Sequence, residues 1–440
     1  MADTIAGFPF WQAEFDKEGH LVGKTAAQFA KDIAAAQLTD LYTFSHGWNN
    51  DDRTAQALYS AFFKEVRALI DSNKVQKQRA ARIGVMGVFW PSILWPDEVP
   101  PALSDEAGDA GGAAAFGAAS DAEDVPIEDL KKIFDESQHD VLDKLGGMLS
   151  ERESNDDTLR DFKETLDALV SASAAAHSKD SERDGLVAGD EDFKAMFKAL
   201  AEDEPAPESE GGAAGLRDQF ATLWNGAKGA LRVATYWQMK ERAGVVGRTG
   251  LGPMLSQIAA EAPDTRLHLI GHSFGARLVS YALAGLANAP EKAWPIKSLL
   301  LLQGAFSHFT FAAQLPHDRT RKGELSGMAD RVDGPLLTTF SDFDTAVGRA
   351  YPLASFAARQ DAAKLAVSRW GAMGHDGAQA VEAEELPLGS TGTRYPFATG
   401  RWINLDGNRI IKTGGPPSGA HSDIIHPEVG WVTLAAAKIV

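Results

Sequence analysis

The chain has 440 residues, of which 44% are hydrophobic, so it can bury a large core. It contains no cysteine, which excludes disulfide bonds, thiolate metal sites and cysteine nucleophiles. Its net charge of −18 comes from one segment, because residues 97–218 hold 33 of the 61 acidic and 11 of the 43 basic side chains; a field of this sign repels polyanions, and we expect no binding to nucleic acid.

The first ten residues lack a basic region followed by an apolar run, which is the pattern of a signal peptide. No stretch of about 18 or more apolar residues occurs either, so no transmembrane segment is predicted. We therefore expect a soluble protein, most simply in the cytoplasm.

Predicted strands and helices alternate along the chain. The first half begins with a short strand within 37–48, an amphipathic helix over 54–71 and an apolar strand over 82–90. The acidic segment 97–218 interrupts this alternation. It has predicted helices near 127–149, 157–176 and 190–201, between two flexible stretches rich in Gly, Ala and Ser at 108–120 and 205–215.

Alternation resumes near Leu231 with a helix-like stretch, followed by helices over 254–262, 276–286 and 429–437 and by strands over 266–270, 297–303 and 336–340. The Asp406-Gly407 pair predicts a β-hairpin between 402–404 and 409–412. This pattern predicts an α/β fold with a doubly wound, mostly parallel sheet. The expected core comprises 1–96 and 219–440, and the acidic, partly helical insertion 97–218.

The strongest motif is Gly271-His272-Ser273-Phe274-Gly275, which lies between a predicted strand and a predicted helix. A serine at such a point needs a very tight turn, and flanking glycines relieve the crowding there. The helix that follows directs backbone N–H groups and a positive dipole toward a developing oxyanion. The pattern indicates a nucleophile elbow with Ser273 as the nucleophile.

This motif and its context resemble the α/β-hydrolase superfamily of serine esterases and lipases, over residues 37–440 apart from the insertion. The family order is nucleophile, acid, histidine. The resemblance places the acid after the strand 336–340, where Asp344 precedes the small apolar pair Ala346-Val347. Asp342 is the alternative acid.

The histidine should come from a loop ahead of the last helix, and two histidines lie there. His421 follows small residues and precedes an Ile-Ile pair, as the catalytic histidine of the family does. His426 precedes Pro427, where a helix begins, and is expected to be a surface or cap residue. His375 is a third candidate by position.

An oxyanion hole is implied by the resemblance at Ser45-His46-Gly47-Trp48, where the predicted first strand ends. In the family a His-Gly pair turns the chain at this point, so the backbone N–H groups of Trp48 and Phe274 would be the donors. His46 would then have a structural role.

The resemblance implies a hydrolase of carboxylic esters that acts on a small-molecule ester or acyl substrate through Ser273, His421 and Asp344. An amidase, peptidase or acyltransferase with the same triad is an alternative, and an inactive hydrolase fold that binds protein is another. No metal or nucleotide motif occurs, so no cofactor is expected. The insertion would be a lid over the site, or else a loop that only aids solubility.

Overall fold

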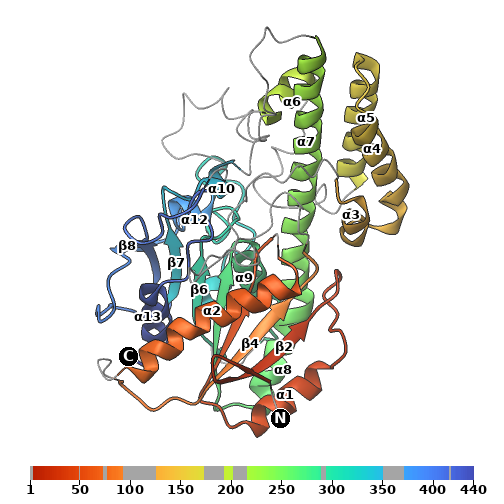
Figure 1. The fold of residues 1–440 in the computed structure, drawn as a ribbon. Coiled ribbons are helices and arrows are strands. Elements are labelled where there is room, and N and C mark those ends of the chain that lie inside the picture. The colour runs from red at the N-terminus through yellow and green to blue at the C-terminus, as the bar shows by residue number, and fades with distance from the viewer. Residues whose placement is uncertain are drawn as a thin grey trace.

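The computed structural model describes residues 3–48, 50–72, 77–92, 125–172, 193–201, 216–288, 294–349, 371–415 and 418–440 (Figure 1). The predicted flexible stretches 108–120 and 205–215 lie outside these residues. None of the helices in the described ranges combines the length and apolar character that crossing a bilayer requires.

A nine-stranded sheet forms the centre of the described part of the chain. Its strand order is β1-β2-β4-β3-β5-β6-β7-β9-β8, and every neighbouring pair is parallel except β1 and β2. The bounds are β1 Asp3–Ile5, β2 Phe8–Glu14, β3 Asp40–Ser45, β4 Ile83–Phe89, β5 Arg266–His272, β6 Ile296–Leu302, β7 Leu336–Phe340, β8 Ala383–Pro387 and β9 Trp402–Asp406. The predicted α/β class with a mostly parallel sheet is confirmed.

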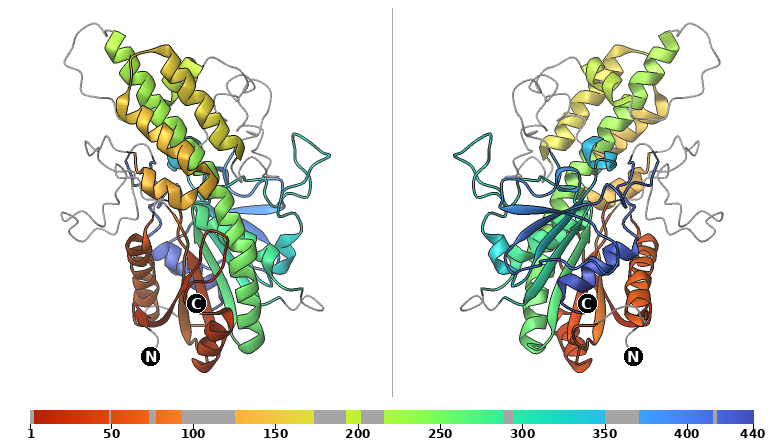
Figure 2. Two further views of the ribbon diagram at one scale, coloured as in Figure 1. Left: turned by 90° about the vertical axis from the view of Figure 1, so that its right-hand side faces the viewer. Right: turned by 90° about the vertical axis from the view of Figure 1, so that its left-hand side faces the viewer.

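Helices cover both faces of this sheet (Figure 2). One face packs against α2 (Asp52–Asp71) and α13 (Pro427–Ala436). The other packs against α1 (Ala26–Ala35), α8 (Gly252–Glu261) and α9 (Phe274–Gly285). Successive side chains of a strand point to opposite faces, so the leucines of β6 alternate between the two cores. This is why the central strands are apolar without interruption.

The described part of the acidic segment is helical, with α3 (Ile127–Ile133), α4 (His139–Glu151), α5 (Asp156–Ala172) and α6 (Phe193–Ala201). These helices pack beside α7 (Leu216–Val245). They lie beyond one end of the sheet, the end at which α10 (Thr345–Arg349) and α12 (Met373–Asp376) are found (Figure 1). The predicted boundary at 218–219 falls in the first turn of α7. A π-helical turn, Val246–Leu251, joins α7 to α8.

The hairpin predicted at Asp406-Gly407 is wrong, because β9 pairs in parallel with both β7 and β8. The Asp406 carboxylate instead accepts the N–H of Asn408, and the Gly407 N–H donates to the carbonyl of Phe340. Three further strands, β1, β2 and β8, were not predicted.

Candidate active site

Ser273 lies on the tight turn between β5 and α9. Its φ of 57° and ψ of −123° are strained for a residue with a side chain. A Cβ on Gly271 would lie 2.3 Å from the carbonyl oxygen of Gly275, and one on Gly275 would lie 2.0 Å from that of Ser45. Both glycines are therefore required by close backbone approach, as the sequence predicted.

Three of the predicted residues form a continuous chain of hydrogen bonds. His421 Nε2 lies 2.8 Å from Ser273 Oγ, and His421 Nδ1 lies 2.9 Å from Asp344 Oδ2. Because a carboxylate only accepts, Nδ1–H donates to Asp344, and Nε2 is left to accept the serine hydroxyl proton. Asp344 is fully buried, whereas Ser273 and His421 are 6% and 7% exposed.

The loops that carry the acid and the histidine are joined by their backbones. Asp344 and Gly419 form an isolated antiparallel bridge, and the Ala420 N–H donates to the carbonyl of Phe343 at 2.8 Å. Gly419 has a φ of 57°, and a Cβ there would lie 2.1 Å from that carbonyl oxygen. This close crossing places His421 over the end of β5.

The predicted oxyanion turn lies directly against the nucleophile. A Cβ on Gly47 would be 2.5 Å from Ser273 Cβ and 3.0 Å from Ser273 Oγ. Phe274 begins α9, and the first turn of a helix leaves backbone N–H groups without an intrahelical acceptor. The Asn50 side-chain amide donates to the carbonyls of Gly47 and Trp48, which fixes the turn.

His46 is buried behind this turn. Burial lowers the pKa of His46 to about 4, although its hydrogen bond to the Gly47 carbonyl opposes this. Its ring stacks on Trp90, and its backbone N–H donates to the Tyr59 hydroxyl, which itself donates to the carbonyl of Val88. The neutral, enclosed imidazole agrees with the structural role expected of it. Tyr59 was not singled out from the sequence.

His272 supports the loop of His421 rather than the serine. Its Nε2–H donates to the His421 carbonyl at 2.9 Å. Burial lowers the pKa of His272 to about 3, and the nearby His421 lowers it further. His272 is therefore neutral near pH 7.

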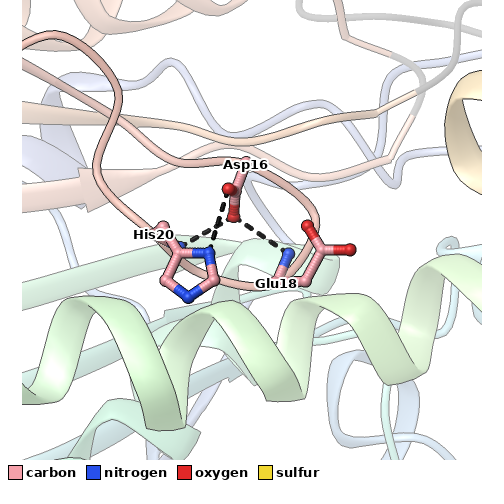
Figure 3. Close-up of side chains that lie close together, drawn as sticks. All are labelled: Asp16, Glu18 and His20. Atoms are coloured by element: carbon pink, nitrogen blue, oxygen red, sulfur yellow. Dashed lines mark hydrogen bonds and ion pairs between the residues drawn. The ribbon is translucent and has the colours of Figure 1, made fainter.

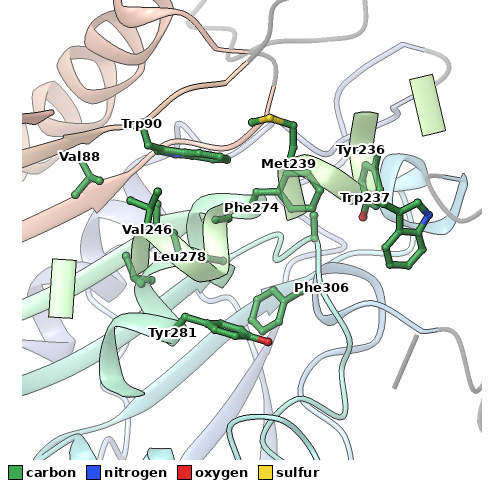
Figure 4. Packing of buried hydrophobic residues seen from close by; sticks show 14 of the residues in the cluster. Val88, Trp90, Tyr236, Trp237, Met239, Val246, Phe274, Leu278, Tyr281 and Phe306 are labelled. Carbon is green, nitrogen blue, oxygen red and sulfur yellow. The ribbon is translucent and has the colours of Figure 1, made fainter. Parts of the chain in front are cut away.

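Helix α7 forms an aromatic wall beside the elbow (Figure 4). The ring centroid of Tyr236 lies 4.7 Å from that of Phe274 and 5.6 Å from that of Trp48. Farther along the same helix, toward its N-terminus, Trp224 packs against Phe162 of α5. One unbroken helix thus connects the acidic segment to the two predicted oxyanion residues.

The alternative residues lie elsewhere. Asp342 is exposed, and its backbone N–H donates to the Asn408 side chain. His426 directly precedes α13, the cap position expected of it, and its ring pairs with Asp423 at 2.8 Å, a contact that was not predicted. His375 is half-buried in α12.

One buried side chain that contacts the site was not singled out from the sequence. Gln303, directly after β6, donates its amide to Asp344 Oδ2 at 2.9 Å. The sequence offered only a weak signal, a polar residue at the carboxyl end of an apolar strand, which is where ligand and catalytic groups gather in parallel sheets.

A second Ser-His-Asp set lies at the opposite end of the sheet. His268 Nδ1 accepts from Ser298 Oγ at 2.8 Å, and its Nε2–H donates to Asp40 Oδ1 at 3.0 Å. Asp40 also forms a two-point ion pair with Arg79. Although burial opposes it, the hydrogen bonds from His268 and Arg79 hold the pKa of Asp40 below its usual range.

Within the described residues, Asp16, Glu18 and His20 are the one group of three metal-ligating side chains close enough to share an ion (Figure 3). The Asp16 carboxylate accepts the N–H groups of Glu18 and His20 and also His20 Nδ1–H. These contacts are those of an exposed Asx turn. The group lies in the loop after β2.

Comparison with known proteins adds no further assignment. No family model matches the chain, and no match was found among curated proteins or solved structures.

Proposed function

We propose that this protein is a serine hydrolase of the α/β-hydrolase type that cleaves carboxylic esters through an acyl-enzyme on Ser273. One observation carries the proposal: the hydrogen-bonded chain from Ser273 to His421 to buried Asp344 starts at a strained residue in front of a helix N-terminus. Strained backbone of this kind persists where the surrounding structure holds it, often at functional sites.

In the first half of the reaction, Ser273 Oγ attacks the acyl carbonyl carbon while its proton passes to His421 Nε2. The imidazolium is stabilised through Nδ1–H by the Asp344 carboxylate. The carbonyl electrons move onto oxygen, which accepts hydrogen bonds from the Trp48 and Phe274 N–H groups. Collapse of this intermediate breaks the ester bond, and His421 returns the proton to the leaving alcohol.

In the second half, water attacks the acyl-enzyme while His421 Nε2 takes its proton. The intermediate collapses, the acid product leaves, and the proton returns to Ser273 Oγ. Water is the one co-substrate this cycle requires. Neutral His46 and His272 take no part in the proton transfers.

The aromatic wall of α7 supports an apolar acyl substrate for this site. Tyr236 contacts both predicted oxyanion residues. Because α7 is a single helix from Leu216 to Val245, a fixed wall is favoured over a lid hinged within α7. Apolar surroundings exclude water and strengthen the oxyanion hydrogen bonds.

Labelling with a fluorophosphonate tests the proposed nucleophile. We expect the wild type to be labelled and Ser273→Ala to be unlabelled. The chain offers a matched control in Ser298→Ala, which removes the serine of the second Ser-His-Asp set and should retain labelling. Labelling that persists in Ser273→Ala would mean that another residue is the reactive nucleophile, and a wild type that is not labelled favours an inactive binding protein. Either result contradicts the proposal.

The leaving group is tested with p-nitrophenyl esters of graded chain length beside the matching p-nitroanilides. Ester turnover that greatly exceeds anilide turnover supports an esterase. The reverse preference identifies an amidase or peptidase with the same triad. Transfer of the acyl group to an added alcohol in preference to water identifies an acyltransferase.

A further inference from the structure

Gln303 occupies a strained and completely buried position behind Asp344. Its φ is 47°, in the left-handed region that residues with side chains rarely adopt. It follows the last residue of β6, so its backbone lies at the same sheet edge as the Ser273 elbow. Such a conformation persists only where the surrounding contacts hold it.

The side-chain amide of Gln303 has a partner on each of its polar atoms. Nε2 donates to Asp344 Oδ2 at 2.9 Å and to the Gly374 carbonyl at 3.0 Å. Oε1 accepts from the Thr339 hydroxyl at 2.9 Å. The carboxylate and the carbonyl can only accept, so the amide has one possible orientation.

Gln303 and His421 therefore donate to the same oxygen atom of Asp344. Asp344 Oδ2 accepts both Gln303 Nε2–H and His421 Nδ1–H, each at 2.9 Å. Its Oδ1 has a long contact, 3.5 Å, to the Val347 N–H. Within the described residues no lysine or arginine forms an ion pair with Asp344, so neutral donors stabilise its buried charge.

We propose that Gln303 is a positioning residue that holds the Asp344 carboxylate toward His421 and tunes the basicity of the imidazole. This inference rests on the proposed function. A hydrogen bond to the charged form of a carboxylate stabilises that charge and spreads it. When the donor is lost, the carboxylate is less well oriented, and its charge attracts the protonated imidazole more strongly.

Two isosteric variants test the donor without opening a cavity. In Gln303→Met the donor is absent: kcat should fall about 10- to 100-fold with little change in KM, and the acid limb of the kcat/KM profile should move to higher pH. In Gln303→Glu a protonated carboxyl can still donate, but its ionisation places two negative charges together. That variant should retain activity at low pH and lose it as the pH rises, a loss that the wild type does not show.

Gln138→Glu is the matched control, because Gln138 is also a buried glutamine whose amide donates to a carbonyl, that of Leu169. It should lower stability and leave the pH profile unchanged. The NMR resonance of the His421 Nδ1 proton gives a readout without turnover, and it should shift in Gln303→Met. Unshifted resonances and unchanged pH profiles in both Gln303 variants overturn the inference, whereas a wild type with no Ser273-dependent activity overturns the proposed function.

Discussion

Replacing Gly47 by alanine should damage the oxyanion turn without removing any group of the triad. The added Cβ would lie 2.5 Å from Ser273 Cβ, whereas carbon atoms in contact are normally about 3.5–4.0 Å apart. The overlap is therefore about 1 Å, and Ser273 cannot yield because its elbow is itself closely packed. The turn, with the Trp48 N–H, has to move away from the nucleophile.

The expected loss follows from the narrow range of useful donor distances, about 2.7–3.1 Å to the oxyanion. A shift of about 1 Å amounts to losing one donor, which lowers kcat by about 10²–10³, or about 3–4 kcal/mol of transition-state stabilisation. We expect KM for p-nitrophenyl butyrate to change little, because the donor acts mainly in the transition state.

The control for this variant is Gly147→Ala, because a Cβ at Gly147 meets no atom within 4 Å. It should leave kcat unchanged. Thermal unfolding of both variants shows whether any loss of activity comes from loss of structure. If folded Gly47→Ala keeps kcat within about threefold of the wild type, the turn does not supply an oxyanion donor, and the reasoning is refuted.

Three further predictions concern the acid, a loop ion pair and the helical segment. Asp344→Asn should lower kcat about 10⁴-fold by disturbing the histidine tautomer, whereas exposed Asp342→Asn should stay within about twofold; equal losses would contradict the assignment of the acid. The ion pair with Asp423 raises the pKa of His426. The stabilisation that His426 provides over His426→Ala should therefore be complete below about pH 6.5 and diminish as the pH rises through the raised pKa. A difference in melting temperature that grows with pH would contradict this. Trp224→Ala should lower the free energy of unfolding by about 3–5 kcal/mol, measured with denaturant; a loss below about 1 kcal/mol would mean that α5 does not pack on α7 as described.

Most of the central sheet could be predicted because its strands are buried on both faces. An apolar run such as 297–303 or 336–340 is then a strong local signal, and β7 has the bounds that the sequence predicted. Edge strands carry a weaker signal. In β8, Ala383–Pro387, two of the five residues are acidic and exposed, so it resembled a solvated loop.

The failed hairpin has a different cause. An Asp-Gly pair between short apolar runs predicts a two-residue turn from local conformation. The partners of β9 are β7 and β8, whose paired residues lie 66 and 19 positions earlier in the chain, since Trp402 pairs with Leu336 and with Ala383. Such distant pairing is decided by how the whole sheet assembles, and the local turn signal does not report it.

The site was easier to predict from its backbone requirements than from its polar network. Glycines 47, 271 and 275 are needed because the turns approach each other, and a sequence displays them directly. The contacts of Gln303 with Thr339, Asp344 and Gly374 join segments up to 71 residues apart. These contacts depend on the positive φ of Gln303, and a glutamine in a sequence gives no sign of such a backbone angle.

The two Ser-His-Asp sets differ in the geometry on which the proposed function depends. Their hydrogen bonds are alike, at 2.8 and 2.9 Å around His421 and 2.8 and 3.0 Å around His268. Ser298, however, lies within β6 near the end where the strand begins. It has no turn to present its hydroxyl and no helix N-terminus behind it.

The carboxylates of the two sets, Asp40 and Asp344, also have different surroundings. Asp40 is paired with Arg79, and the positive charge of Arg79 offsets the negative charge of Asp40 that would stabilise an imidazolium at His268. Burial also lowers the pKa of His268. Asp344 meets only neutral donors and His421 among the described residues, so no cation offsets its charge toward the imidazole. The strained elbow at Ser273 and a carboxylate without a cationic partner therefore distinguish the set that we propose to be catalytic. Ser298→Ala should accordingly lower stability while leaving ester turnover intact.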